Sequence, residues 1–360
     1  MKRECRMRNH GEVKRGWATS RRLGIVLGVP GLILVVAIAV LVRWGTRWTI
    51  PRASVEGSGY ELLAHWDGAG LPSGPFERPI GIAVTPRGDL YVTDARKRVA
   101  HLSATGDVIG EWGREGDGPG EFSNPVGVAV APDGSVFVSD YDQDRVQKFA
   151  SDGRFLLEFG SSGSEPGQFN APAGLAVDAS GFIYVADFYN HRVQKFRSDG
   201  TFQSIIGHPG RLGDGALHYP TGVQVTPDGQ LLVADAYNYQ LQWFDREGHP
   251  LRRVGYHLFW LWPRPVSSRK GFSVPTGTAV GPDGLIHVAD SGNHRIVMLS
   301  GEGKYLADWT IPDARPNVYS PEKVAVSPDG STIYATDLAA NRLLVLSIVH
   351  PGRSSGGGKR

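Results

Sequence analysis

Short apolar runs separated by turn residues recur along most of the chain, and the clearest copy of the pattern lies at residues 172–207. Within this copy the runs GLAV, FIYVAD, RVQKF and FQSIIG alternate with segments rich in Gly, Asp, Ser and Asn. Each run has the length of a strand and is rich in β-branched or aromatic residues, and each boundary carries residues that favour a turn. The pattern predicts a meander of four antiparallel strands.

The same unit is repeated along the chain. A Pro-x-Gly tripeptide opens each copy except the last, where Lys323 replaces the glycine, and its prolines are Pro79, Pro125, Pro172, Pro220, Pro275 and Pro321. The second strand of each copy ends on an aspartate: Asp94, Asp140, Asp187, Asp235, Asp290 and Asp337. Because the prolines and the aspartates recur at nearly matching intervals, we interpret them as marking six copies of one unit. Four-stranded units repeated about every 40–50 residues are typical of the blades of a β-propeller.

The two ends of the array are expected to meet. The sixth copy stops after three strands, at residues 346–349. Its fourth strand is expected to come from residues 59–66, GYELLAHW, which resemble fourth-strand runs such as GRFLLEFG at 153–160. This pairing would close the ring and remove free sheet edges. We therefore predict an all-β, six-bladed propeller over residues 59–350, followed by a flexible tail at 351–360.

The array resembles NHL-repeat propellers. Asn190-His191-Arg192 and Asn293-His294-Arg295 carry the signature of that family in its clearest form. The resemblance extends over roughly residues 59–349, although Gln240 replaces the signature arginine in one copy. Propellers of this family serve many functions, so the resemblance implies a fold and leaves the activity open.

An apolar segment without charged residues precedes the array, at residues 23–42. At about 1.5 Å per residue, such a run is long enough to cross a hydrocarbon core of about 30 Å. It predicts a single transmembrane helix that anchors the protein in the cell membrane, with a linker at residues 43–58. The alternative is a cleaved signal peptide of bacterial type, with Ala37-Ile38-Ala39 as the cleavage box.

The charge distribution predicts the orientation of the chain and excludes one class of partner. Residues 1–22 carry a net charge of +6, which leaves −4 of the total of +2 for the rest. An excess of basic residues before the apolar segment predicts a cytoplasmic tail and an extracytoplasmic propeller. A mildly acidic propeller has no electrostatic basis for binding nucleic acid. The single cysteine, Cys5, lies in the tail, so the propeller should fold without disulfides.

Candidate ligand-binding residues lie in the loops between second and third strands. These loops should share one face with the connections between blades, and their aromatic and amide side chains suit a protein, peptide or glycan ligand. The candidates are Tyr141, Asp142, Phe188, Tyr189, His191, Tyr237, Asn238, Tyr239 and His294. The alternative is that the aromatic rings only pack against neighbouring blades. The recurrent Asp and Arg residues, present in nearly every copy, are expected to stabilise the loops.

The spacing between copies is widest where residues 256–272, YHLFWLWPRPVSSRKGF, are inserted. Phe259, Trp260 and Trp262 give this segment more apolar surface than a loop normally exposes. Such a patch indicates contact with a membrane interface or a partner protein, and the alternative is a lid over its own blade.

An enzymatic function is the alternative to a binding function. The array also resembles peptidyl-hydroxyglycine amidating lyase, which holds zinc through histidines on one face of its propeller, including the residue between the Pro and Gly equivalents. The matching residues in this chain include no histidine: Ile80, Val126, Ala173, Thr221, Thr276 and Glu322. A lactonase of this fold needs an acidic calcium site, for which Glu322 is a lone candidate. We therefore predict no metal, no cofactor and no catalytic residue, and favour a membrane-anchored binding or scaffold module over a metal-dependent lyase or lactonase.

Overall fold

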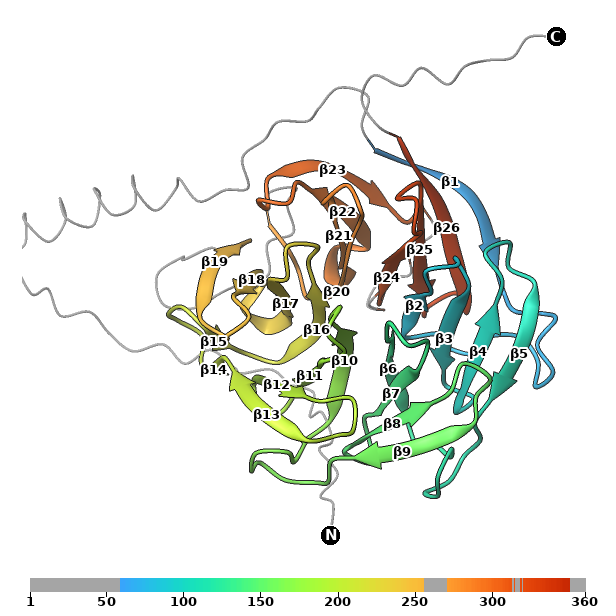
Figure 1. The fold of residues 1–360 in the computed structure, drawn as a ribbon. Helices are drawn as coiled ribbons and strands as arrows, with labels where there is room; N and C mark the ends of the chain where they lie inside the picture. Colours follow the sequence, from blue (N-terminus) through green and yellow to red (C-terminus); the bar gives the residue numbers. More distant parts are fainter. Residues whose placement is uncertain (1–58, 256–270, 313, 315–317, 319, 350–360) are drawn as a thin grey trace, which may run out of the picture. The chain divides into compact units, whose positions relative to one another are not determined.

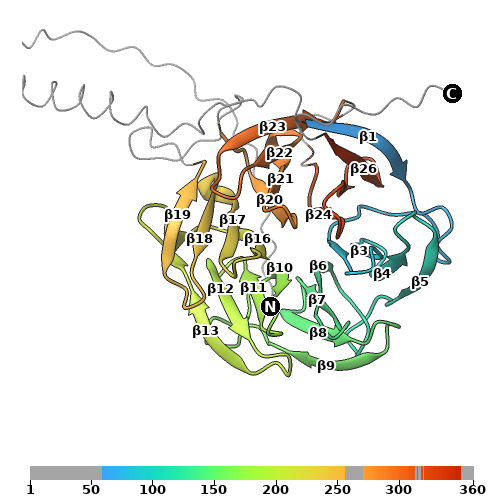
Figure 2. The ribbon, with the colours of Figure 1, turned by 45° about the horizontal axis from the view of Figure 1, so that its top comes forward.

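The computed structural model describes residues 59–255, 271–312, 314, 318 and 320–349, all within one compact unit of the chain. Six four-stranded antiparallel sheets surround a common axis as the blades of a propeller (Figures 1 and 2). Apart from two 3-10 turns, η1 (Ala236–Asn238) and η2 (Ser291–Asn293), this described part contains no helix. The predicted all-β, six-bladed fold is confirmed.

The strands of each blade follow one another from the channel outwards, and their bounds agree with the predicted runs. Blades 1 and 2 consist of β2 (Ile82–Val84), β3 (Leu90–Asp94), β4 (Arg98–Leu102), β5 (Val108–Trp112), β6 (Pro125–Val130), β7 (Val136–Asp140), β8 (Arg145–Phe149) and β9 (Phe155–Phe159). Blades 3 and 4 consist of β10 (Pro172–Val177), β11 (Ile183–Asp187), β12 (Arg192–Phe196), β13 (Phe202–Ile206), β16 (Pro220–Val225), β17 (Leu231–Asp235), β18 (Gln240–Phe244) and β19 (Pro250–Val254). A short parallel pair, β14 (His208–Pro209) and β15 (Ala216–Leu217), lies in the connection between them.

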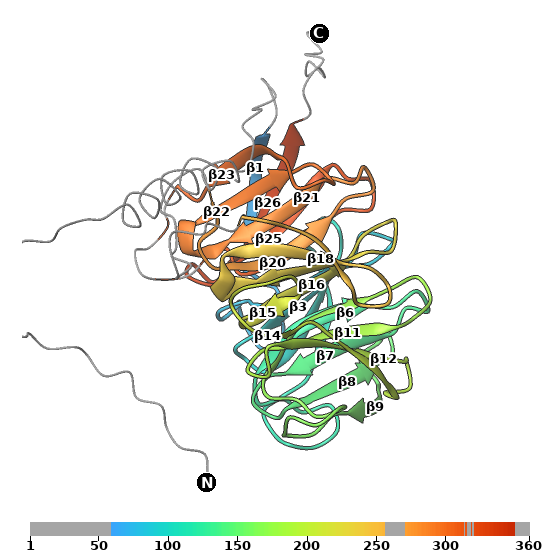
Figure 3. The ribbon, with the colours of Figure 1, turned by 90° about the vertical axis from the view of Figure 1, so that its left-hand side faces the viewer.

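Blade 6 joins the two ends of the described chain. Blade 5 consists of β20 (Pro275–Val280), β21 (Ile286–Asp290), β22 (Arg295–Leu299) and β23 (Tyr305–Thr310), and blade 6 of β24 (Val324–Val326), β25 (Thr332–Asp337), β26 (Arg342–Val349) and β1 (Gly59–Trp66). β1 pairs antiparallel with β26 from Gly59 opposite Val349 to Trp66 opposite Leu343. Figure 3 shows these two strands, blue and red, side by side. The predicted closure of the ring by the N-terminal strand is confirmed.

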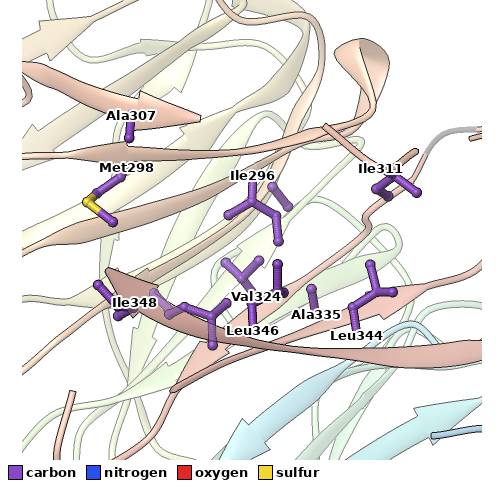
Figure 4. Close-up of a cluster of buried hydrophobic side chains, with 12 residues drawn as sticks. Ile296, Met298, Ala307, Ile311, Val324, Ala335, Leu344, Leu346 and Ile348 are labelled. Carbon is purple, nitrogen blue, oxygen red and sulfur yellow. The ribbon is translucent and has the colours of Figure 1, made fainter. Parts of the chain in front are cut away.

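Alternating side chains of each strand pack against the two neighbouring blades. On β26, Leu344 and Leu346 enter the cluster shared with blade 5, whereas Leu343 and Val345 enter the cluster shared with blade 1. The described residues form six such apolar clusters, one at each junction between blades. Figure 4 shows the cluster between blades 5 and 6. Because each fully buried Leu or Ile contributes roughly 1.5–3 kcal/mol, these junctions hold the ring together.

Several predicted segments lie outside the described residues. These are the tail at residues 1–22, the transmembrane helix at 23–42, the linker at 43–58, the terminal tail at 351–360, and Phe259, Trp260 and Trp262 of the insertion. Among the residues that are described, none belongs to a helix with the length and apolar character needed to span a membrane.

Candidate functional site

The loops between second and third strands lie beside the connections between blades, on one face of the ring. Among the described residues, main-chain hydrogen bonds join the loops of blades 1 to 5 to the connections that enter the same blades. Tyr141 N donates to Asn124 O at 2.9 Å, and Tyr189 N donates to Asn170 O at 3.1 Å. We call this the loop face, and the hairpins between first and second strands lie on the other face.

Five aromatic rings form a continuous surface on the loop face, which we call the aromatic patch: Tyr141, Phe188, Tyr189, Tyr219 and Tyr237. Phe188 lies at its centre, with ring centroids 6.0 Å from Tyr141 and 4.9 Å from both Tyr189 and Tyr219. Tyr237 adjoins Tyr219 at 5.0 Å. The patch thus crosses blades 2, 3 and 4, and it leaves 47% of Tyr189 and 38% of Tyr237 exposed.

A residue in the left-handed conformation ends each of the six loops, and in three of them its side chain joins neighbouring blades. Asp144, His191 and Asn341 occupy this position with φ near +55°. Their side chains accept a hydrogen bond from the N–H that precedes the proline of the next blade: Ala171 N to Asp144 Oδ1 at 2.8 Å, Tyr219 N to His191 Nδ1 at 3.0 Å, and Arg78 N to Asn341 Oδ1 at 2.9 Å. His191 therefore has a structural partner, and its Nδ1 must carry no proton.

A pair of stacked histidines supports the patch from one side. The rings of His191 and His218 lie 5.1 Å apart and 11° from parallel, and Tyr219 packs edge-on against both. Burial, together with the nearby Arg211 and His191, lowers the pKa of His218 to about 4. Burial and Arg211 also lower the pKa of His191. Both rings are therefore neutral at physiological pH, so the surface beside the patch carries no histidine charge.

The nine residues predicted from the sequence occupy different environments. Tyr141, Phe188, Tyr189 and Tyr237 form most of the patch, and Asp142 is exposed beside Tyr141. The other four residues are not part of the aromatic patch. His191 is half-buried against Tyr219, and Asn238 is fully buried. Tyr239 takes the left-handed position of blade 4, and His294 belongs to blade 5. Sequence reasoning missed Tyr219 and His218, whose only signal was their place just before Pro220.

A cavity of about 470 Å³ opens beside the patch at the edge of blade 3. Tyr189, Ile205 and Pro209 give it apolar walls, and Asn190 and His208 give it polar groups. Ile205 is 40% exposed. The exposed ring of Tyr189 therefore borders both the aromatic patch and this cavity.

The aspartates that end the second strands stabilise the loops, as expected. Asp187 accepts hydrogen bonds from Asn170 N and Asn190 Nδ2, and it pairs with Arg192 Nε at 2.8 Å. Asp94, Asp290 and Asp337 likewise pair with Arg98, Arg295 and Arg342. In blade 2 the expected direct pair is replaced, because Arg145 bonds to Glu158 and to two main-chain carbonyls.

In the part of the chain that the structure describes, no cation pairs with the aspartate of blade 4. Asp235 is fully buried, and its carboxylate accepts hydrogen bonds from His218 N, Asn238 Nδ2, Gln240 Nε2 and Gln242 Nε2 at 2.7–2.9 Å. All four donors are neutral. Burial raises the pKa of Asp235 to about 6, because these hydrogen bonds offset only part of the desolvation.

Replacing Gln240 with arginine should raise the free energy of unfolding at pH 7 and flatten its decline between pH 4 and pH 6. The pKa of Asp235 is about 6 in the fold against an ordinary value of 3.8, so its contribution is full below pH 4 and is lost as the pH rises through 6. The loss corresponds to about 3 kcal/mol at 1.36 kcal/mol per pKa unit. Urea unfolding at several pH values measures it. Gln203→Arg is the control, and equal pH profiles for the two variants would contradict the interpretation.

The central channel offers no cluster of metal ligands among the described residues. Its cavity of about 260 Å³ is lined by residues of the first strands, mostly glycine and aliphatic residues, together with Gln224, Thr278 and Lys323. Glu322, the lone acidic candidate, is half-buried, and burial raises its pKa against the opposing effects of Lys323 and Arg78.

Comparisons with known proteins support the repeat assignment and the fold. The NHL repeat model matches residues 122–149, 169–196, 217–244 and 272–298. No curated protein matches the chain significantly. Among solved structures, a streptogramin B lyase is 15% identical with a TM-score of 0.54, covering 82% of this chain and 100% of that chain.

Two further structures have the same likeness. A catalytically inactive virginiamycin B lyase from Staphylococcus aureus with quinupristin is 16% identical, has a TM-score of 0.53, and covers 82% of this chain and 89% of that chain. A putative gluconolactonase is 18% identical and has a TM-score of 0.54, and the match covers 84% of this chain and 94% of that chain. At these identities the likeness concerns the fold alone. The chain thus contains four NHL repeats within a six-bladed β-propeller.

Proposed function

We propose that this propeller is a binding or scaffold module whose aromatic patch holds a protein, peptide or glycan ligand. The observation that carries the proposal is the patch itself, with rings from three blades in contact and Tyr189 and Tyr237 partly exposed. Exposed aromatic rings on a rigid support give a large contact area at a small cost in conformational entropy. A six-bladed ring supplies that support.

Two features of the surroundings favour a ligand over mere packing between blades. Rings that only fill a junction would be covered, as Phe149 and Phe196 are, whereas Tyr189 keeps 47% of its surface exposed. The neighbouring cavity adds apolar walls and the polar groups of Asn190 and His208. Concave surfaces with apolar walls and a few polar groups are typical of ligand sites.

Substituting Tyr189 and Tyr237 with serine should weaken ligand binding by about tenfold or more, the loss expected for aromatic anchors. Binding of the labelled protein to a glycan array and to a random peptide library gives the ligand, and titration of the best hit gives the dissociation constant. The control is Leu156→Ser, which removes a side chain of similar exposure from an outer strand. If the double variant retains its affinity, or if the control loses as much, the patch is not the binding site.

We further propose that residues 23–42 anchor the module in the cell membrane with the propeller outside the cytoplasm, and that Phe259, Trp260 and Trp262 contact the membrane or a partner. The support is the uncharged apolar segment and the basic residues before it. Protease treatment of intact cells expressing the protein should digest the propeller's exposed loops. Complete protection in intact cells, with digestion after lysis, would contradict this orientation.

A metal-dependent lyase or lactonase is the alternative function, and the fold likeness to a streptogramin B lyase and a putative gluconolactonase is its support. Metal analysis of the purified protein separates the two proposals. A stoichiometric zinc or calcium ion favours the enzyme, and its absence after purification in buffers with added metal favours the binding module.

A further inference from the structure

Six main-chain carbonyl groups belong to the residues that directly follow the opening prolines of the six copies, each next to a residue that lines the channel. We call them the mouth carbonyls: those of Ile80, Val126, Ala173, Thr221, Thr276 and Glu322. In three places a hydroxyl from the preceding blade donates to them: Thr93 Oγ1 to Val126 O at 3.0 Å, Ser139 Oγ to Ala173 O at 2.6 Å, and Thr336 Oγ1 to Ile80 O at 2.9 Å. Each of these hydroxyl residues directly precedes the aspartate that ends its second strand.

The other three blades have alanine at the hydroxyl position. Ala186, Ala234 and Ala289 are fully buried and precede Asp187, Asp235 and Asp290. By the same register, the carbonyls that lose this donor are those of Thr221, Thr276 and Glu322. A buried carbonyl without a hydrogen bond destabilises the fold, so these three groups need donors from elsewhere.

Lys323 supplies the missing donors for two of the three. Its ammonium nitrogen, Nζ, donates to Thr221 O at 2.8 Å and to Thr276 O. The third carbonyl, of Glu322, accepts a hydrogen bond from Thr276 Oγ1 at 2.6 Å. Lys323 belongs to blade 6, and its side chain reaches carbonyl groups of blade 5 and blade 4. Each mouth carbonyl therefore has a donor.

The path of the lysine side chain explains its position in the repeat. Lys323 occupies the place of the glycine of the Pro-x-Gly tripeptide in the other blades, and it is 8% exposed. A Cβ atom added to Gly277 of blade 5 would lie 2.9 Å from Lys323 Cδ, so the neighbouring glycine leaves room for the side chain. Burial lowers the pKa of Lys323 to about 8, and Glu322 opposes this effect. The amine remains mostly protonated at neutral pH.

We propose that the mouth carbonyls of blades 4 and 5 form a binding site for a primary ammonium group, which the chain fills with its own Lys323. The ammonium group of Lys323 takes the place of the hydroxyl donors that Ala186 and Ala234 lack. The site's ligand class is a small alkylammonium ion, because the single nitrogen of an ammonium group donates to both carbonyl oxygens at once, as Lys323 Nζ does beside the channel cavity. This proposal is independent of the aromatic patch and concerns a different part of the ring.

Chemical rescue of a truncated lysine tests the ligand class. The full chain carrying Lys323→Ala, purified in mild detergent, should melt several degrees below the wild type. n-Propylammonium, which replaces the missing atoms, should raise its melting temperature in a saturable manner and leave the wild type unchanged. Tetramethylammonium, which has no N–H donor, is the control. Absence of saturable rescue, or equal rescue by tetramethylammonium, would overturn the proposal.

A second set of variants tests the site even if Lys323→Ala does not fold. Lys323→Met keeps the aliphatic chain but removes the ammonium group, and adding Ala186→Ser and Ala234→Ser restores the hydroxyl donors used in blade 2. The triple variant should recover most of the melting temperature lost by Lys323→Met. Adding Ala289→Ser to Lys323→Met is the matched control and should recover nothing, because Thr276 already serves the Glu322 carbonyl. Failure of the triple variant to recover, or equal recovery by the control, would refute the proposed site.

Discussion

Deleting residues 59–66 is expected to unfold the propeller or convert it into aggregates. The deletion removes β1, so that β26 keeps its pairing with β25 but loses its other neighbour from Leu343 to Val349. It also removes Tyr60, Ala64 and Trp66 from the two apolar clusters of blade 6. Seven residue pairs join the two strands. At about 1 kcal/mol for each net hydrogen bond, together with the lost apolar burial, the free energy of unfolding should fall by more than about 5 kcal/mol, a large share of the 5–15 kcal/mol typical of a folded domain.

Size-exclusion chromatography and urea unfolding of the full chain measure this effect. The matched control keeps β1 and changes only its outward side chains, with Leu62→Ser and Leu63→Ser, which are 42% and 58% exposed. We expect the control to remain monomeric with nearly unchanged stability. A deletion variant that unfolds cooperatively at the wild-type urea concentration would show that closure by β1 contributes little.

Replacing Arg192 with alanine is expected to lower the free energy of unfolding by about 3–5 kcal/mol, the cost of leaving a buried charge without its partner. Arg192 Nε pairs with the fully buried Asp187, and its Nη2 atom donates to Glu165 O and Gln168 O. The substitution leaves a carboxylate and two carbonyls without these donors. Urea denaturation followed by tryptophan fluorescence measures the loss.

Arg192→Gln is the matched control, because blade 4 carries the same arrangement in its natural sequence. There Gln240 Nε2 donates to Asp235 at 2.8 Å. Glutamine at position 192 should therefore lose roughly half as much stability as alanine, or less. A loss within 0.5 kcal/mol for Arg192→Ala, the range of ordinary surface substitutions, would mean that the pair does not support the loop.

The sequence was sufficient to predict the fold because each blade repeats its turn chemistry and its strand pattern. Asp140 and Asp187 end strands at the predicted residues, and Gly59–Trp66 pairs where the missing fourth strand was expected. These features depend on local preferences and on a period that sequence comparison within the chain reveals. Neither requires knowledge of which residues meet across a junction.

The candidate site was only partly predictable, because its contacts form between blades. Tyr219 stands in a connection and joins the patch through Phe188 of the previous blade. Asn238 looked like an exposed loop amide, yet the loop turns it inward to bond with Asp235. Lys323 was recognisable as a departure from the repeat, but its partners Thr221 and Thr276 belong to other blades.

The pairing of β1 with β26 has a consequence for biosynthesis. Trp66, the last residue of β1, leaves the ribosome long before Arg342, the first residue of β26. At about 5–20 residues per second, this delay lasts tens of seconds. During that time the earliest strand has no partner and the growing array has an open edge. A nascent chain of this protein is therefore expected to need chaperone protection until its final strand is made, and translation arrest before Arg342 should leave a species that proteases cut within β1.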